Sequence, residues 1–255
     1  MARLAIRHLV ACALGASLLA GCGGGGGGDD DPAPTLQGVW DTTLSPGGDT
    51  GGALVLEDGT LWAFSGPSTS INALYQGVVS VNANSLSSAN LRLFATNTGQ
   101  VAAVSNVSGS LAGNTFSLTG STGAGAATVN GSRSPADASY NYDTAAQLGD
   151  IQGSWSGAFS TGDTGVVTVQ ANGSFSSTTS AGCSFTGTAT PRASGKNVFN
   201  VTLTFGASPC LLPNVSGSGV ALAARAAGGN PAALIVMATT NDRSAAAIYL
   251  ALRAN

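Results

Sequence analysis

An internal duplication constrains the fold of this 255-residue chain more than any other feature. Four short motifs of the first half recur in the same order in the second half, at separations that drift from 115 to 108 residues. The matching pairs are Leu36–Trp40 with Ile151–Trp155, Gly48–Gly51 with Gly162–Gly165, Asp58–Thr60 with Asn172–Ser174, and Asn106–Ser110 with Asn214–Ser218. Because the order is kept while the spacing varies, we expect two copies of one unit, at residues 36–134 and 151–255, joined by a linker at 135–150.

Each copy carries the pattern of β-strands. Residues such as Val201–Phe205 and Ile248–Arg253 alternate apolar and polar side chains with a period of two. Asp58-Gly59 and Asn172-Gly173 favour tight hairpins, because these residue types tolerate positive φ. About eight short strands per copy predict an all-β fold of two homologous antiparallel up-and-down meanders. Each meander closes into a small barrel, or the two together form one fused sandwich; the sequence leaves both arrangements open.

The first 22 residues have the organisation of an export signal. Arg3 and Arg7 precede an apolar run, Leu9–Leu19, that is shorter than the roughly 20 residues a membrane-spanning helix needs. The run ends in Leu19-Ala20-Gly21-Cys22, which resembles the lipobox of bacterial lipoproteins. That resemblance implies that residues 1–21 are removed as a signal peptide and that Cys22 is lipidated. In that family an Asp after the Cys favours inner-membrane retention. The residue after Cys22 is Gly23 here, which implies the outer membrane. Both the periplasmic side and the cell-surface side of that membrane stay possible locations.

Residues 22–35 then form a tether. Six consecutive glycines, Gly23–Gly28, are followed by three aspartates and two prolines, a composition that stays flexible and cannot pack. We therefore expect the membrane to be a partner of this protein through its N-terminal lipid.

Composition narrows the possible functions. Charged residues make up 8% of the chain against a usual share of about 25%, and the net charge is −3, which argues against nucleic-acid binding. The only histidine, His8, lies in the signal, so a Ser-His-Asp triad is excluded from the mature chain. The sequence predicts no catalytic residue, no metal and no cofactor.

Two cysteines remain once Cys12 and Cys22 are assigned to the signal and the lipid. Cys183 and Cys210 form an even pair in an exported chain, which predicts a structural disulfide. Zinc is disfavoured because structural zinc sites take four nitrogen or sulfur ligands.

The duplicated Asp-Thr-Gly at Asp49 and Asp163 resembles the paired motif of pepsin-like proteases, in which two carboxylates activate water. In that family an apolar strand runs directly into the Asp, whereas Gly-rich turn residues precede both aspartates here. A duplicated hairpin tip explains the motif, and a hydrolase using Asp49 and Asp163 is a remote alternative.

Five aromatic residues are candidates for binding or packing. Gly38-Val39-Trp40 and Gly153-Ser154-Trp155 resemble the first strand of lipocalin- and avidin-type barrels, where the Trp closes one barrel end. The chain equally resembles the small barrels of surface lipoproteins that bind host proteins. Trp62 and Phe64 share one face of a strand whose other face is also apolar, and Tyr75 lies nearby in sequence. Burial at the junction of the copies is favoured over an exposed patch.

These features predict a non-enzymatic binding or surface-interaction lipoprotein of the cell envelope, with a protein partner. The alternative is a carrier that holds a small apolar ligand inside its barrels.

Overall fold

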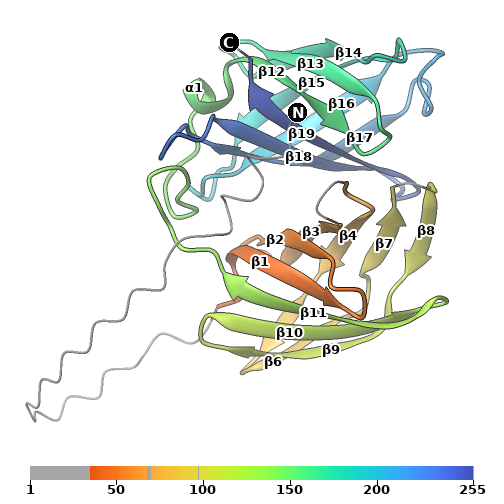
Figure 1. The fold of residues 1–255 in the computed structure, drawn as a ribbon, viewed down its shortest axis with the longest axis vertical. Coiled ribbons are helices and arrows are strands. Elements are labelled where there is room, and N and C mark those ends of the chain that lie inside the picture. Colours follow the sequence, from red (N-terminus) through yellow and green to blue (C-terminus); the bar gives the residue numbers. More distant parts are fainter. Residues whose placement is uncertain (1–34, 68–69, 97, 255) are drawn as a thin grey trace, which may run out of the picture.

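The computed structural model describes residues 35–67, 70–96 and 98–254. It consists of two β-units, one above the other in Figure 1, with the segment that joins them running along one side. The predicted signal peptide, Cys22 and nearly all of the predicted tether lie outside the described residues, so lipidation at Cys22 remains a prediction.

The first unit is an open antiparallel sheet of eleven strands. In chain order the strands are β1 (Gly38–Ser45), β2 (Thr50–Val55), β3 (Thr60–Gly66), β4 (Ala73–Val78), β5 (Ser80–Asn82), β6 (Ser85–Ser88), β7 (Arg92–Ala95), β8 (Gln100–Ala103), β9 (Ser105–Ala112), β10 (Thr115–Thr122) and β11 (Gly125–Arg133).

This unit is all-β, as the sequence predicts, but it neither closes nor follows a simple meander. The β5–β6 hairpin pairs with β9, whereas the β7–β8 hairpin returns to pair with β4, so the two hairpins extend opposite edges of one sheet. The sequence predicts one strand at 73–81, which the structure divides into β4 and β5. Ala83, at a φ of 51°, forms the tight turn after β5. The edge strands of the sheet are β5 and β8, which do not pair with each other, so the sheet stays open.

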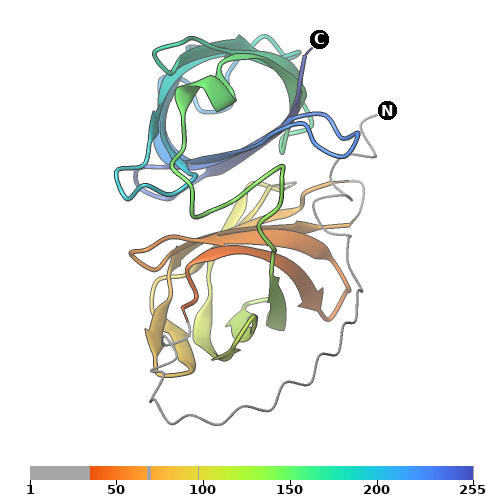
Figure 2. The ribbon, with the colours of Figure 1, turned by 90° about the vertical axis from the view of Figure 1, so that its left-hand side faces the viewer.

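The second unit is a closed barrel of eight antiparallel strands, seen end-on in Figure 2. A short helix, α1 (Leu148–Ile151), precedes it. The strands are β12 (Gly153–Phe159), β13 (Thr164–Val169), β14 (Ser174–Thr178), β15 (Ser184–Pro191), β16 (Phe199–Phe205), β17 (Ser216–Ala224), β18 (Ala233–Thr240) and β19 (Ala246–Arg253). Here each strand pairs with the next, and β19 returns to β12, as an up-and-down meander requires.

Alternating burial places the apolar side chains inside each unit. In β16 the side chains of Phe199, Val201 and Leu203 are buried, and the intervening Asn200 and Thr202 are exposed. The barrel core gathers such residues from all parts of the second unit, and an equivalent core lies on one face of the first sheet. The two-residue period of the sequence therefore specifies which face of each strand is buried.

The two units pack against each other through a third apolar cluster. Leu54, Trp62 and Leu74 of the first unit are buried together with Met237 and Ile248 of the second. Figure 1 shows the corresponding strands facing each other, with β2, β3 and β4 below β18 and β19. The first sheet is thus apolar on both faces where it meets the barrel, which explains why β3 lacks an alternating polar face.

Candidate functional site

The two Gly-x-Trp motifs make the same contacts in both units. Trp40 and Trp155 are fully buried, and each indole Nε1–H donates to the backbone carbonyl four residues earlier, Leu36 O at 2.8 Å and Ile151 O at 2.6 Å. An arginine from the last strand of each unit lies over the ring: the Cζ of Arg133 is 4.3 Å from the ring centre of Trp40. Both tryptophans are therefore packed inside their units, with no exposed surface.

The glycine of each motif makes room for that arginine. Gly38 and Gly153 have φ values of 130° and 115°, which side chains rarely adopt. A Cβ at Gly38 would stand 2.5 Å from Nη1 of Arg133, and one at Gly153 would stand 3.0 Å from Nη1 of Arg253. Arg133 and Arg253 were not among the candidates drawn from the sequence. The sequence feature that could have identified them is an arginine at the end of the last strand in both copies.

The other three aromatic candidates lie in or against the apolar clusters of the protein. Trp62 is 5% exposed and belongs to the cluster between the units, and Phe64 packs against that cluster. Tyr75 packs instead against the core of the first unit, and burial raises its pKa. None of the three forms an exposed aromatic surface.

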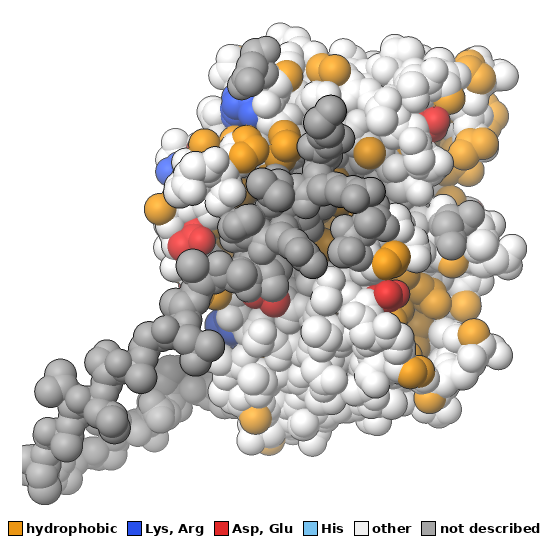
Figure 3. Space-filling view, in the orientation of Figure 1, with side chains coloured by type: hydrophobic (Ala, Val, Ile, Leu, Met, Phe, Trp, Pro, Cys, Tyr) orange, Lys and Arg blue, Asp and Glu red, His pale blue; other side chains and the backbone are white. Residues whose placement is uncertain are grey.

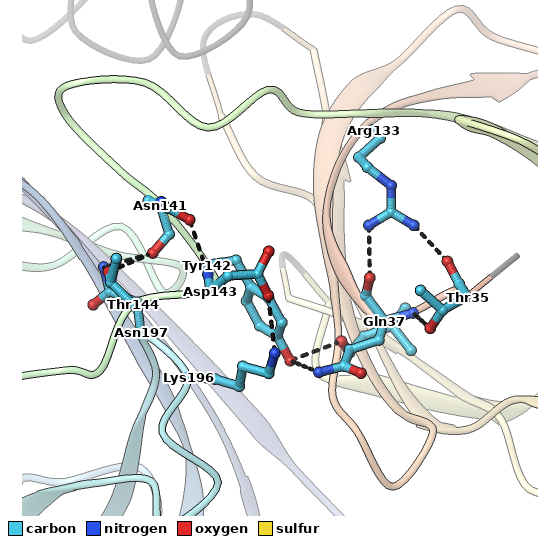
Figure 4. A network of polar contacts seen from close by, with 10 residues as sticks. Thr35, Gln37, Arg133, Asn141, Tyr142, Asp143, Thr144, Lys196 and Asn197 are labelled. Carbon is cyan, nitrogen blue, oxygen red and sulfur yellow. Dashed lines mark hydrogen bonds and ion pairs between the residues drawn. The ribbon is translucent and has the colours of Figure 1, made fainter. Parts of the chain in front are cut away.

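The joining segment fastens the units by hydrogen bonds. The hydroxyl of Tyr142 donates to Val55 O and accepts from Nε2 of Gln37, and Nζ of Lys196 lies 2.9 Å from Oδ1 of Asp143 (Figure 4). Tyr140 donates to Asn197 O at 2.5 Å, and burial raises its pKa. The segment predicted as a linker is therefore bonded to both units.

Two arginines from the barrel reach across the junction. Arg192 contacts both Glu57, at 2.7 Å, and Asp58, at 2.9 Å. Arg243, in the β18–β19 turn, donates to Gln76 O at 2.5 Å and to Asn90 O at 2.8 Å of the first unit. Directional contacts flank the apolar cluster, so the two units are held in one orientation.

The two Asp-Thr-Gly motifs are not brought together as a catalytic pair. Asp49 lies in the turn between β1 and β2, and Asp163 in the turn between β12 and β13, each within its own unit. Among the described residues, no hydrogen bond joins the two carboxyl groups; that of Asp163 accepts from the hydroxyl of Thr161 at 3.1 Å. Two carboxylates that share a proton stand about 3 Å apart, so the arrangement is that of two hairpin tips.

The interior of the closed barrel is nearly full. Its apolar cavity measures about 60 Å³ and is bordered by the rings of Phe159, Phe175 and Tyr249. Phe159 stacks on Tyr249 with centroids 4.5 Å apart, and burial raises the pKa of Tyr249 to about 12. Pockets for small organic ligands occupy about 300–1,000 Å³. Phenylalanine rings thus fill the space that a carrier would need.

The loop between β16 and β17 is the strongest candidate for a contact site. A disulfide joins Cys210 of this loop to Cys183 in the β14–β15 loop. The next residue, Leu211, is 79% exposed, more than Val166 at 47%, Val81 at 41% and Val78 at 38%. Figure 3 shows hydrophobic side chains gathered at the upper right, where this end of the barrel lies. The sequence assigned the disulfide but not the exposed leucine beside it.

The loop backbone is ordered by its own hydrogen bonds. Cys210 N donates to Ala207 O at 3.1 Å, Val215 N donates to Leu212 O at 3.2 Å, and Asn214 N donates to Gly206 O at 2.9 Å. A side chain presented on a preorganised loop loses less conformational entropy on binding. The backbone on either side of Leu211 is therefore held in place, and the Leu211 side chain extends into solvent.

Other kinds of site are not found in the part of the chain that the structure describes. No group of three or more His, Cys, Asp or Glu side chains could hold a metal ion within residues 35–67, 70–96 and 98–254. Over the same residues, no helix has the length and apolar character to cross a membrane.

Comparisons with known proteins give little further information. No family model matches the chain, and no match was found among curated proteins. Among solved structures, it resembles a tryptophan-to-alanine mutant of the vaccine antigen Transferrin Binding Protein B from Haemophilus parasuis Hp5, with 7% identity and a TM-score of 0.27. The match covers 82% of this chain and 66% of that chain, so the chain spans just under two thirds of that structure. A similarity this low transfers neither a ligand nor a partner.

Proposed function

We propose that this protein is a lipid-anchored lipoprotein of the outer membrane that acts as a non-enzymatic interaction module. The exposed Leu211 on its disulfide-linked loop carries the proposal. The export signal and the lipobox ending in Cys22 supply the anchor, and the two fastened β-units supply a rigid support for the loop.

The chemistry of the loop favours a protein partner. Residues 197–224 contain no charged side chain, and the neighbours of Leu211 along the chain are the uncharged Pro209, Cys210, Leu212 and Pro213. Depletion of charged residues is typical of the core of a protein–protein interface, and an exposed apolar side chain loses contact with water when a partner covers it. The partner is expected to offer an apolar pocket that takes the leucine side chain.

Site-specific photocrosslinking tests this role in cells that make the full-length protein. A photoreactive amino acid at position 211 is expected to yield a discrete covalent adduct with a protein. The same group at Val166, which is also exposed on the barrel, serves as the matched control. Equal adduct yields at the two positions would refute recognition through the loop.

The anchor is tested separately. Lipid labelling is expected in the wild-type chain and absent from a Cys22→Ser variant, which should leave the membrane fraction. Protease treatment of intact cells then distinguishes the two faces: digestion places the protein outside, and protection places it in the periplasm. A labelled Cys22→Ser variant would contradict lipidation at this residue.

A further inference from the structure

A hollow lined by hydroxyl groups lies on the wall of the closed barrel, over β14, β15 and β16. Its volume is about 420 Å³, within the range of about 300–1,000 Å³ for small-molecule sites. The hydroxyl side chains that line it are Ser174, Ser176, Thr186, Thr188, Thr202 and Thr204. Gln170, Phe175, Gly187 and Leu203 complete the lining, and Phe175 and Leu203 also border the apolar cavity on the inner side of the barrel wall.

The register of the three strands arranges these hydroxyls in two rows. Ser174, Thr188 and Thr202 are cross-strand neighbours in one row, and Ser176, Thr186 and Thr204 form the other. Neighbours within a row are about 4.8 Å apart across the strands, and the rows are about 6.6 Å apart along them. The six side chains thus form a regular grid on one face of the sheet.

The hydroxyls keep hydrogen-bonding capacity for a ligand. Thr188 and Thr202 share one hydrogen bond, 2.8 Å between their Oγ1 atoms, and Thr204 shares one with Ser216 at 2.9 Å. The Ser174 hydroxyl donates to Oδ1 of Asn172 at 2.7 Å and keeps its acceptor positions. Each hydroxyl has one donor and two acceptor positions, so a single shared bond leaves others open. The threonine methyl groups add apolar contact area between the hydroxyls.

The charge distribution indicates the kind of ligand. Residues 164–191, which include β14 and β15, carry no charged side chain. The basic side chains of the described chain are engaged elsewhere: Arg92, Arg192 and Arg243 at the junction, Arg133 and Arg253 over tryptophans, and Lys196 and Arg225 with aspartates. Phosphate, sulfate and carboxylate ligands are usually held by Arg or Lys.

We propose that this hollow binds a neutral oligosaccharide. Sugar hydroxyls both donate and accept hydrogen bonds, as the side chains of the grid do, and the carbon–hydrogen faces of sugar rings match the threonine methyl groups. The inference goes beyond recognition through Leu211 and does not depend on it. A binding site for glycan would give the module a second ligand on the same barrel.

Titration of the purified full-length protein with cellohexaose, maltohexaose and chitohexaose tests the proposal by saturation-transfer NMR and calorimetry. At least one of these neutral probes is expected to bind with a Kd in the millimolar range or below. The double variant Thr186→Val and Thr202→Val keeps the β-branched shape but removes two hydroxyls, and should raise the Kd roughly tenfold or more.

A matched control lies on the first unit. Thr119 and Thr128 form an exposed threonine pair with Oγ1 atoms 2.8 Å apart, remote in the fold from the hollow. The Thr119→Val and Thr128→Val variant should leave the Kd within about twofold. No binding of any of the three probes, or an equal effect of the two double variants, would overturn the proposal.

Discussion

The guanidinium carbon of Arg253 lies 4.5 Å from the centre of the Trp155 ring, with its nitrogens bonded to Gln152 O at 2.7 Å and Asp150 O at 2.8 Å. Arg133 stands in the same relation to Trp40 in the first unit. One arginine thus holds three elements together: the last strand that carries it, the first strand, and the segment before that strand. The same contacts therefore occur in a sheet that closes into a barrel and in one that stays open.

Replacing Arg253 by Ala should lower the free energy of unfolding of the barrel by about 2–3 kcal/mol. The change removes a cation–π contact and two hydrogen bonds to backbone carbonyl groups, one exposed and one partly buried. Urea unfolding monitored by tryptophan fluorescence measures the loss. Arg225→Ala, which removes an exposed pair with Asp150, should change stability little. Similar losses in both variants would argue against a special role for the stacked arginine.

Removing the disulfide with Cys183→Ser and Cys210→Ser should destabilise the protein by about 3.5 kcal/mol. The bond closes a loop with a sequence separation of 27 residues, and opening it gives the unfolded chain more conformations. Urea unfolding of the wild type with and without reductant provides the measurement. Reductant should have no effect on the double variant, and the crosslink yield at position 211 should fall because the loop loses its attachment.

Trp62→Ala should uncouple the two units. Emptying the centre of the junction cluster costs about 3–5 kcal/mol, and most of that loss falls on contacts between the units. Calorimetry is expected to show two thermal transitions in place of one. Val166→Ala, an exposed position on the barrel, should leave a single transition at the wild-type temperature. One unshifted transition in the Trp62→Ala variant would contradict the junction as the coupling element.

The turn that carries Arg243 should give the protein a measurable acid sensitivity. Hydrogen bonds from Thr240 and Ser244 lower the pKa of Asp242 to about 2, below the value of about 3.9 for an unfolded chain. The stabilisation is therefore complete above about pH 4 and is lost as the pH falls toward 2. Urea midpoints between pH 2 and 5 should fall less steeply with acid in an Asp242→Asn variant.

Asp41 provides a control, because ionisation of its carboxyl group has the opposite effect on the stability of the fold. Burial raises its pKa, against a hydrogen bond to Ser134 that lowers it, so ionisation of Asp41 opposes folding. Asp41→Asn should therefore raise the urea midpoint above about pH 4, where Asp242→Asn lowers it. Parallel pH profiles for the two variants would refute these assignments.

Local patterns predicted much of the architecture. Alternation in segments such as Val201–Phe205 gave the correct buried faces, and the apolar faces of residues 61–64 indicated a strand enclosed on both sides. The repeated Asn106 and Asn214 also have a local cause, because both adopt positive φ, at 52° and 59°. Each of these features depends on residues close in sequence.

The sequence by itself determined the all-β class and the cysteine pair, because side-chain alternation, turn residues and cysteine positions can be read directly from the chain. Tertiary structure alone decided that the second unit closes while the first stays open, since closure depends on which distant edges pair. It also decided that Trp62 is covered while Leu211 is exposed. Both are apolar residues, and their exposure follows from what the rest of the chain places over them.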